Sequence, residues 1–180
     1  MIYVYGDDAS DQRKERVIAV AAIAGYEDWW QQVEVDWTAR CGGIPFHATD
    51  CESDSGDYKD IPHEQNKGMY RDLVGILATS RLGGIGLAYD LVASKKVFPG
   101  NVVPVYFRAF ADCIVRAASL AENLGETAEI TFDISLENEY NAGQLYSYAR
   151  RMDERLAKWL HPQSRLYPGE NLFACKWPTY

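Results

Sequence analysis

The chain begins with two short apolar runs whose residues favour β-structure, and this opening is its strongest constraint on the fold. Residues 2–6 read Ile-Tyr-Val-Tyr-Gly, and residues 17–23 form a continuous apolar run. Residues 9–16 between them are polar and typical of a hairpin loop. The pattern predicts two antiparallel strands, of which the second is buried.

Helical and strand patterns alternate through the rest of the chain. Apolar residues recur at helical spacing in four segments, and short β-prone runs lie between or after them. The predicted helices cover residues 26–41, 63–81, 105–124 and 140–160, the predicted strands 85–92, 129–135 and 172–177, and surface loops 51–62 and 94–101. This order predicts an α/β fold in which a mixed sheet packs against helices, in a single domain over residues 1–180.

The composition is that of a globular protein. Of the 180 residues, 47% are hydrophobic and 24% charged, and no segment approaches the roughly 20 apolar residues of a membrane helix. The N-terminus lacks the features of a secretory signal. Because the four cysteines are scattered, we expect thiols in a cytoplasmic protein rather than disulfides. We expect no membrane partner.

The net charge of −8 argues against broad, nonspecific attraction to nucleic acid. It does not exclude a nuclease, because metal-binding carboxylates themselves contribute to that charge. A bound divalent ion would reverse the local field at such a site.

The first predicted strand leads directly into two adjacent carboxylates, Asp7 and Asp8. A strand delivers such a side chain on a rigid backbone, which suits a metal ligand. Because neighbouring residues of a strand face opposite sides, at most one of the two points into a given site. The alternative is a strand end capped by turn-forming aspartates.

Asp133 lies inside another β-prone run, between Phe132 and Ile134. A carboxylate buried there without a partner is costly, so we expect a metal ion or another cation nearby. The alternative is an edge strand with a solvated polar face. Two strands that each deliver an acidic residue indicate a metal site and phosphoryl-transfer chemistry, provided that the strands lie side by side.

Two further candidates, Glu139 and His47, lie outside the predicted strands. Glu139 could supply a ligand or a general base, or belong to the polar start of a helix, where acidic residues favour the helix dipole. His47 could orient a phosphate or protonate a leaving group, or be a structural hydrogen-bonding residue. Cys41, His47 and Cys51 do not match the spacing of a zinc site.

Lys95 and Lys96, in the expected loop, could meet phosphates or form a solvated charged surface. The sequence contains no phosphate-binding glycine loop with its lysine, no dinucleotide fingerprint and no nucleophile elbow. The sequence therefore lacks the usual motifs of P-loop nucleotide hydrolases, of dinucleotide-dependent enzymes and of serine hydrolases.

Taken in order, these motifs resemble the domain of unknown function 3800 family, prokaryotic proteins with a ribonuclease H-like fold. The resemblance covers nearly the whole chain and rests on Asp7-Asp8-Ala9-Ser10, Phe46-His47-Ala48, Ile130-Thr131-Phe132-Asp133 and Ala174-Cys175-Lys176-Trp177-Pro178. Asp8 departs from the family pattern, which usually has Glu. The family also continues into a Gln-x-x-Asp helix, whereas this sequence stops at Tyr180. Either the protein is a short form, with an incomplete acidic cluster, or a C-terminal piece lies outside the sequence.

The resemblance implies a ribonuclease H-like mixed sheet flanked by helices and two-metal hydrolysis of phosphodiester bonds in RNA or DNA. Asp7 and Asp133 would lie on adjacent strands and bind Mg²⁺ or Mn²⁺, which prefer carboxylate oxygens. Asp8 or Glu139 would be an auxiliary carboxylate. His47 would contact the substrate or support the ligands.

The alternative is a catalytically inactive ribonuclease H-like module that binds a protein partner or a second copy of the chain. Ribonuclease H-like folds host many functions, so the fold alone does not decide. In this alternative, Trp29, Trp30 and Trp37 on one helix form the interface; otherwise they fill the core.

Overall fold

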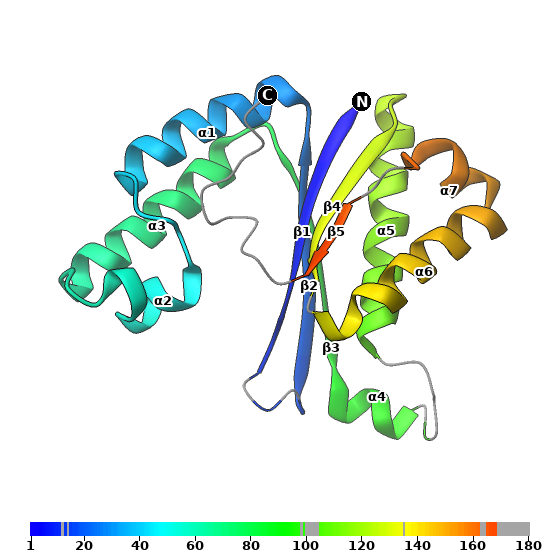
Figure 1. Ribbon diagram of the computed structural model, residues 1–180, viewed down its shortest axis with the longest axis horizontal. Helices are drawn as coiled ribbons and strands as arrows, with labels where there is room; N and C mark the ends of the chain where they lie inside the picture. Colours follow the sequence, from blue (N-terminus) through cyan, green and yellow to red (C-terminus); the bar gives the residue numbers. More distant parts are fainter. Residues whose placement is uncertain are drawn as a thin grey trace. The chain divides into compact units, whose positions relative to one another are not determined.

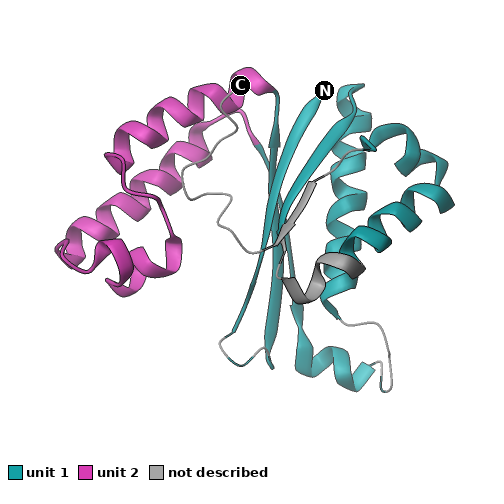
Figure 2. Cartoon of the chain, in the orientation of Figure 1, with its two compact units in different colours: residues 1–26, 83–169 teal, residues 27–82, 170–180 magenta. Residues whose placement is uncertain are grey.

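The computed structural model describes residues 1–11, 13, 15–97, 99, 105–134, 136–162 and 165–168, with side chains except at 134, 136–141 and 165–168. The chain forms two compact units (Figure 2). Unit 1 comprises residues 1–26 and 83–169, and unit 2 comprises residues 27–82 and 170–180. Each unit has its own hydrophobic core. The prediction of a single domain over 1–180 stays a prediction.

Unit 1 is built on a five-stranded mixed sheet with the order β3-β2-β1-β4-β5 (Figure 1). The strands are β1 (Ile2–Ser10), β2 (Val17–Gly25), β3 (Gly83–Asp90), β4 (Ala128–Ile134) and β5 (Arg165–Pro168). The first three strands form an antiparallel meander. β4 runs parallel to β1, and β5 runs parallel to β4.

The predicted α/β class, with a mixed sheet flanked by helices, is confirmed, and the architecture is consistent with a ribonuclease H-like fold. The structure contradicts one alternative and adds one strand that was not predicted. β4 lies between β1 and β5, so the alternative that Asp133 belongs to an edge strand is wrong. The fifth strand is formed by Arg165–Pro168, and the strand predicted at 172–177 lies outside the described residues.

The core of unit 1 lies between the sheet and α5 (Val105–Leu124), with α6 (Leu136–Met152) and α7 (Glu154–Trp159) on the same side (Figure 1). α5 is strongly amphipathic, and its buried residues recur every three or four positions: Tyr106, Ala109, Phe110, Cys113, Ile114, Ala117, Ala118 and Ala121. The small alanines allow close approach of the helix to the sheet.

Two predicted boundaries in unit 1 are wrong for local reasons. The helix predicted over 140–160 is interrupted at Asp153, whose carboxylate accepts the backbone N–H groups of Arg155 and Leu156 and caps α7. The loop expected at 94–101 begins as a helix, α4 (Leu91–Val97). Asp90 Oδ1 accepts the N–H of Ala93 in its first turn.

Unit 2 consists of α1 (Glu27–Cys41), α2 (Ala48–Ser53), the 3₁₀ turn η1 (Gly56–Tyr58) and α3 (His63–Thr79). Its core holds Cys41, Cys51, Tyr58, Met69 and Leu73. The surface loop expected over 51–62 is wrong, because α2 continues into it and because Cys51 and Tyr58 are buried there. None of the described helices combines the length and apolar character needed to cross a bilayer.

Candidate functional site

The two predicted metal ligands lie on neighbouring parallel strands. β1 and β4 pair in register from Ile2 with Ala128 to Gly6 with Phe132. Asp7 and Asp133 are the next residue on each strand. Neighbouring strands lie about 4.8 Å apart, so the register brings the two aspartates together where the β1–β4 ladder ends.

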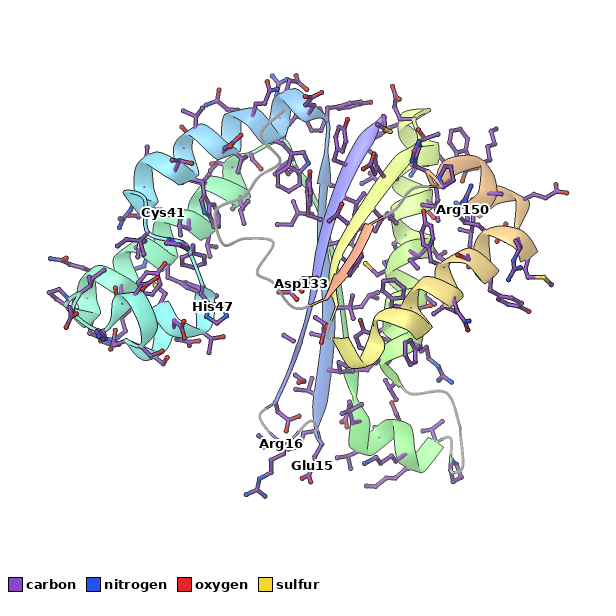
Figure 3. The ribbon with its side chains drawn as sticks, in the orientation of Figure 1. Glu15, Arg16, Cys41, His47, Asp133 and Arg150 are labelled. Carbon is purple, nitrogen blue, oxygen red and sulfur yellow. The ribbon has the colours of Figure 1, made fainter. Side chains whose placement is uncertain are left out.

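Asp7 and Asp133 share one face of the sheet. Along β1, Ile2, Val4 and Gly6 are buried against the core, whereas Asp7 is exposed. Asp133 alternates in the same way with buried Phe132 and is half-buried. Figure 3 shows the Asp133 side chain on the side of the sheet away from α5. Asp8, by the same alternation, belongs to the face that α5 covers.

The residues just before the two aspartates are tightly packed. A Cβ at Gly6 would lie 2.4 Å from Cζ of Phe132, so only glycine fits over that ring. The Phe132 ring packs edge-to-face on Phe110 of α5, with the centroids 5.1 Å apart. This contact fixes β1 and β4 against the core immediately before Asp7 and Asp133.

The charges of three carboxylates on β1 and β4 act on one buried phenol, that of Tyr106 in the first turn of α5. Burial raises the pKa of Tyr106 above its usual range, and the negative charges of Asp8, Asp7 and Asp133 raise it further, in that order. The Asp8 backbone N–H donates to Asp7 Oδ1 at 2.7 Å. The predicted acidic residues of both strands therefore contribute to one region of negative potential.

The sheet face beside Asp7 carries small residues. Asp7 pairs with Ala21 of β2, and Ala21 pairs with Gly86 of β3. Ala21 and Gly86 are both exposed. This row across the sheet therefore has no bulky side chain next to Asp7 that would keep a ligand away from its carboxylate.

The donor set fits a hard cation. Nowhere in the described part of the chain do three His, Cys, Asp or Glu side chains form a group that could hold a metal ion. Mg²⁺, however, is usually held by one or two carboxylates together with water and substrate oxygens. Asp7 and Asp133 provide such a pair, and their oxygen donors fit Mg²⁺ or Mn²⁺ better than Zn²⁺.

The predicted auxiliary residue Glu139 lies in the first part of α6, and its side chain is outside the described set. Its position agrees with the polar helix start that was the alternative for it. Its role as a ligand or base stays a prediction.

The predicted His47 belongs to unit 2, where it precedes α2. Its Nδ1 lies 3.0 Å from Oδ2 of Asp50, and the side chain is 46% exposed. The other oxygen of Asp50 accepts from Ser55 Oγ at 3.0 Å. These contacts explain His47 as a residue that helps to fix the start of α2, and its contact with a substrate stays a prediction.

A polar cluster that was not predicted from the sequence surrounds Asn66 in unit 2. The Asn66 side chain is 0% exposed, and its Nδ2 donates to Asp54 Oδ1 at 2.8 Å and to the Tyr58 carbonyl at 3.1 Å. Nδ1 of His63 lies 2.6 Å from the second oxygen of Asp54. Hydrogen bonding from Asn66, followed by that from His63, lowers the pKa of Asp54.

This cluster ties the segment after α2 to α3. A sequence signal for it exists, because Asn66 falls on the same helical stripe as the buried Met69 and Leu73. A polar residue on an apolar stripe needs internal hydrogen-bond partners, and only the folded chain shows that residues 54–61 provide them.

The two cysteines of unit 2 that the structure describes are structural. Cys41 and Cys51 are buried in its core, and the Cys51 thiol donates to the Asn66 carbonyl at 3.4 Å. Burial raises the pKa of Cys51, which disfavours the thiolate that zinc requires. Cys113 is likewise a buried thiol, and Cys175 lies outside the described residues.

Comparisons with known proteins add no family assignment. No protein-family model matches the chain, and a search of curated proteins finds no significant match. The resemblance to the domain of unknown function 3800 family therefore stays an expectation from the sequence motifs.

Proposed function

We propose that the chain is a divalent-metal-dependent nuclease that hydrolyses phosphodiester bonds of RNA or DNA. The register of β1 and β4 carries the proposal, because it sets Asp7 and Asp133 next to each other on one face of the sheet. Like charges brought together repel. A divalent cation offsets this repulsion and becomes the dominant local charge.

In this proposal Asp7 and Asp133 hold Mg²⁺ or Mn²⁺. When bound, such ions polarise the phosphate and activate the attacking water. Asp8 lies on the other face of β1 and is assigned an auxiliary role, because its N–H orients the Asp7 carboxylate. The exposed row through Ala21 and Gly86 leaves space for a sugar–phosphate strand beside the carboxylates.

The test is cleavage of end-labelled single- and double-stranded RNA and DNA with Mn²⁺ and, separately, with EDTA. We expect Mn²⁺-dependent cleavage that Asp7→Asn and Asp133→Asn each remove. Glu129→Gln is the matched control, because Glu129 also lies on β4 and shares the alternating face of Asp133, four residues away. Unchanged activity in either aspartate variant would contradict the assignment.

The second candidate function is a binding or assembly module that keeps the fold without catalysis. The net charge of −8 favours it, because that charge opposes attraction to nucleic acid. The tryptophan interface expected for such a module has less support, because Trp30 is buried and Trp37 packs edge-to-face on Phe46 at the core of unit 2. Calorimetry with Mn²⁺ separates the two candidates, since a module of this kind should show no specific heat of metal binding.

A further inference from the structure

Unit 1 concentrates exposed positive charge at the end of the sheet where β1 turns into β2. Arg13 and Arg16 lie in this turn, and Lys95 and Lys96 lie in α4, which begins directly after β3. All four residues are exposed, and we call them the basic end. The chain as a whole carries a net charge of −8, whereas here the four cations outnumber the three carboxylates that the structure describes in the same segments, Asp11, Glu15 and Asp90.

The two parts of the basic end are joined by the backbone. Val17 at the start of β2 pairs with Asp90 at the end of β3. The Leu91 N–H, at the start of α4, donates to the Arg16 carbonyl at 2.8 Å. Figure 1 shows α4 and the β1–β2 turn at the same end of the sheet. The two segments that carry the four cations therefore lie next to each other at this end of the sheet.

Asp11 shapes the turn that presents the arginines. Its carboxylate accepts the backbone N–H groups of Arg16 and Val17, each at 2.9 Å. Asp11, Arg13, Glu15 and Arg16 line a concave pocket of about 400 Å³. Figure 3 shows Arg16 directed away from the sheet, and its side chain is 81% exposed.

The cations of the basic end are available to an external anion. Arg16 approaches Asp11 only at 4.0 Å. Arg13, Lys95 and Lys96 form no ion pair with any residue in the part of the chain that the structure describes. Arginine binds phosphate through a planar fork of donors, and lysine binds it as a point charge.

We propose that the basic end binds the sugar–phosphate backbone of a nucleic-acid strand that reaches Asp7 and Asp133. This inference rests on the proposed nuclease function and adds to it the surface that holds the substrate. Arg13 follows Asp7 by six residues, which an extended strand spans in at most about 20 Å. That length corresponds to about six nucleotides at the rise of a nucleic-acid strand.

The common end of the sheet favours nucleic acid over other polyanions. The carboxylates and the basic end occupy the same half of unit 1, since β1 carries Asp7 and leads directly into the turn. A polyphosphate strand can contact both, with its phosphates neutralised by cations at one end and by metal at the other. An isolated anionic head group would use only the basic end.

The experiment measures binding of fluorescein-labelled single strands of RNA and DNA, about 12 nucleotides long, by anisotropy. EDTA is present, so that cleavage does not interfere. The test variant is R13Q/R16Q/K95Q/K96Q. The matched control is K59Q/K67Q/R71Q/R81Q, which removes the same charge from exposed positions of unit 2. Circular dichroism confirms folding, and R13K/R16K/K95R/K96R keeps the charge.

We expect the test variant to bind at least about tenfold more weakly in 0.1 M salt. The slope of its log affinity against log salt concentration should correspond to about three fewer phosphate contacts. The unit 2 control and the charge-keeping variant should bind like the wild type. Equal affinity of wild type and test variant, or equal losses in test and control variants, would overturn the inference. Failure of the wild type to bind either strand would also overturn it. So would a loss of binding in the test variant that is seen with phosphatidylserine vesicles and not with RNA or DNA.

Failure of this inference and failure of the nuclease proposal give different results. Binding that depends on the basic end, without Mn²⁺-dependent cleavage, overturns the nuclease proposal and leaves the binding surface. Cleavage that depends on Asp7, with binding unaffected by the basic-end substitutions, overturns the binding surface and leaves the nuclease.

Discussion

Carboxylates have two different surroundings in this protein, one in each unit. In unit 2, Asp54 accepts hydrogen bonds from Asn66 and contacts the His63 ring. In unit 1, the charges of Asp7 and Asp133, together with that of Asp8, act on a single buried phenol. In unit 2 two side chains contact a single carboxylate, whereas in unit 1 three carboxylates on two neighbouring strands act on the same group.

This difference separates a structural carboxylate from a candidate functional one. A carboxylate matched by donors fixes a segment of the fold, as Asp54 does between α2 and α3. Carboxylates held by neighbouring rigid strands on one face of a sheet, as Asp7 and Asp133 are, are suited to bind a cation. The number of acidic residues in a region is therefore less informative than the groups that face them.

Exchanging single carboxylates in the two units should have opposite effects, and this is the largest contrast we predict. Asp7→Asn should lower metal-dependent cleavage at least about 100-fold without a loss of stability, because it removes a cation ligand. Asp54→Asn should keep cleavage unchanged and lower the melting temperature. Parallel rate and calorimetric measurements check this, and a nuclease rate that is lost in Asp54→Asn but kept in Asp7→Asn would reverse the comparison.

The donor network of unit 2 can be broken from the side of Asn66. Asn66→Ala leaves the half-buried Asp54 oxygen and the Tyr58 carbonyl without their donor, so the free energy of unfolding should fall by about 1–3 kcal/mol. Asn123→Ala is the control, because Asn123 is exposed on α5 and its replacement should change stability by less than about 0.5 kcal/mol. Urea denaturation measures both, and similar values would show that the network contributes little.

The packing beneath the unit 1 carboxylates can be tested at Gly6. Gly6→Ala should lower the free energy of unfolding by about 1–3 kcal/mol, because the added Cβ would overlap the Phe132 ring. Gly84→Ala, on exposed β3 with no atom near its added Cβ, should not destabilise the protein in the same way. Phe132→Leu should relieve part of the Gly6→Ala penalty in a double-mutant cycle. Additive effects would contradict the proposed contact.

The smallest effect we predict is a pH dependence from Asp11 at the β1–β2 turn. Backbone hydrogen bonds from Val17 and Arg16 lower the pKa of Asp11 to about 2, from 3.8. A lowered pKa means that its contribution to stability is complete above pH 3.8 and is lost as the pH falls through about 2. NMR titration of the Asp11 carboxyl carbon checks this, and a midpoint near 3.8 would show that the turn does not hold the carboxylate.

Long periodic segments of the fold were predictable from the sequence. The helix predicted at 105–124 matches α5, and the strands predicted at 2–6 and 17–23 lie within the longer β1 and β2, because burial of one face or of a whole run leaves a clear pattern. The short helices α2 and α4 were missed. They have six and seven residues, too few to show a helical period, and burial of Cys51 helps to stabilise α2.

The candidate site was predictable only in part. Asp7 and Asp133 were recognisable as acidic residues on strands, but their proximity depends on a parallel pairing across more than 120 residues of sequence. Local propensity carries no information on such a register. Asn66 and Gly6 were missed because their roles depend on partners, residues 54–61 and Phe132, that only the folded chain brings to them.

The central claim is that Asp7 and Asp133 share a divalent cation, and anomalous diffraction from crystals grown with Mn²⁺ tests it most directly. We predict an anomalous peak between the two carboxylates, with oxygen distances of about 2.0–2.2 Å, that disappears in Asp133→Asn. Carboxylates more than about 8 Å apart, with no peak beside either one, would contradict the claim.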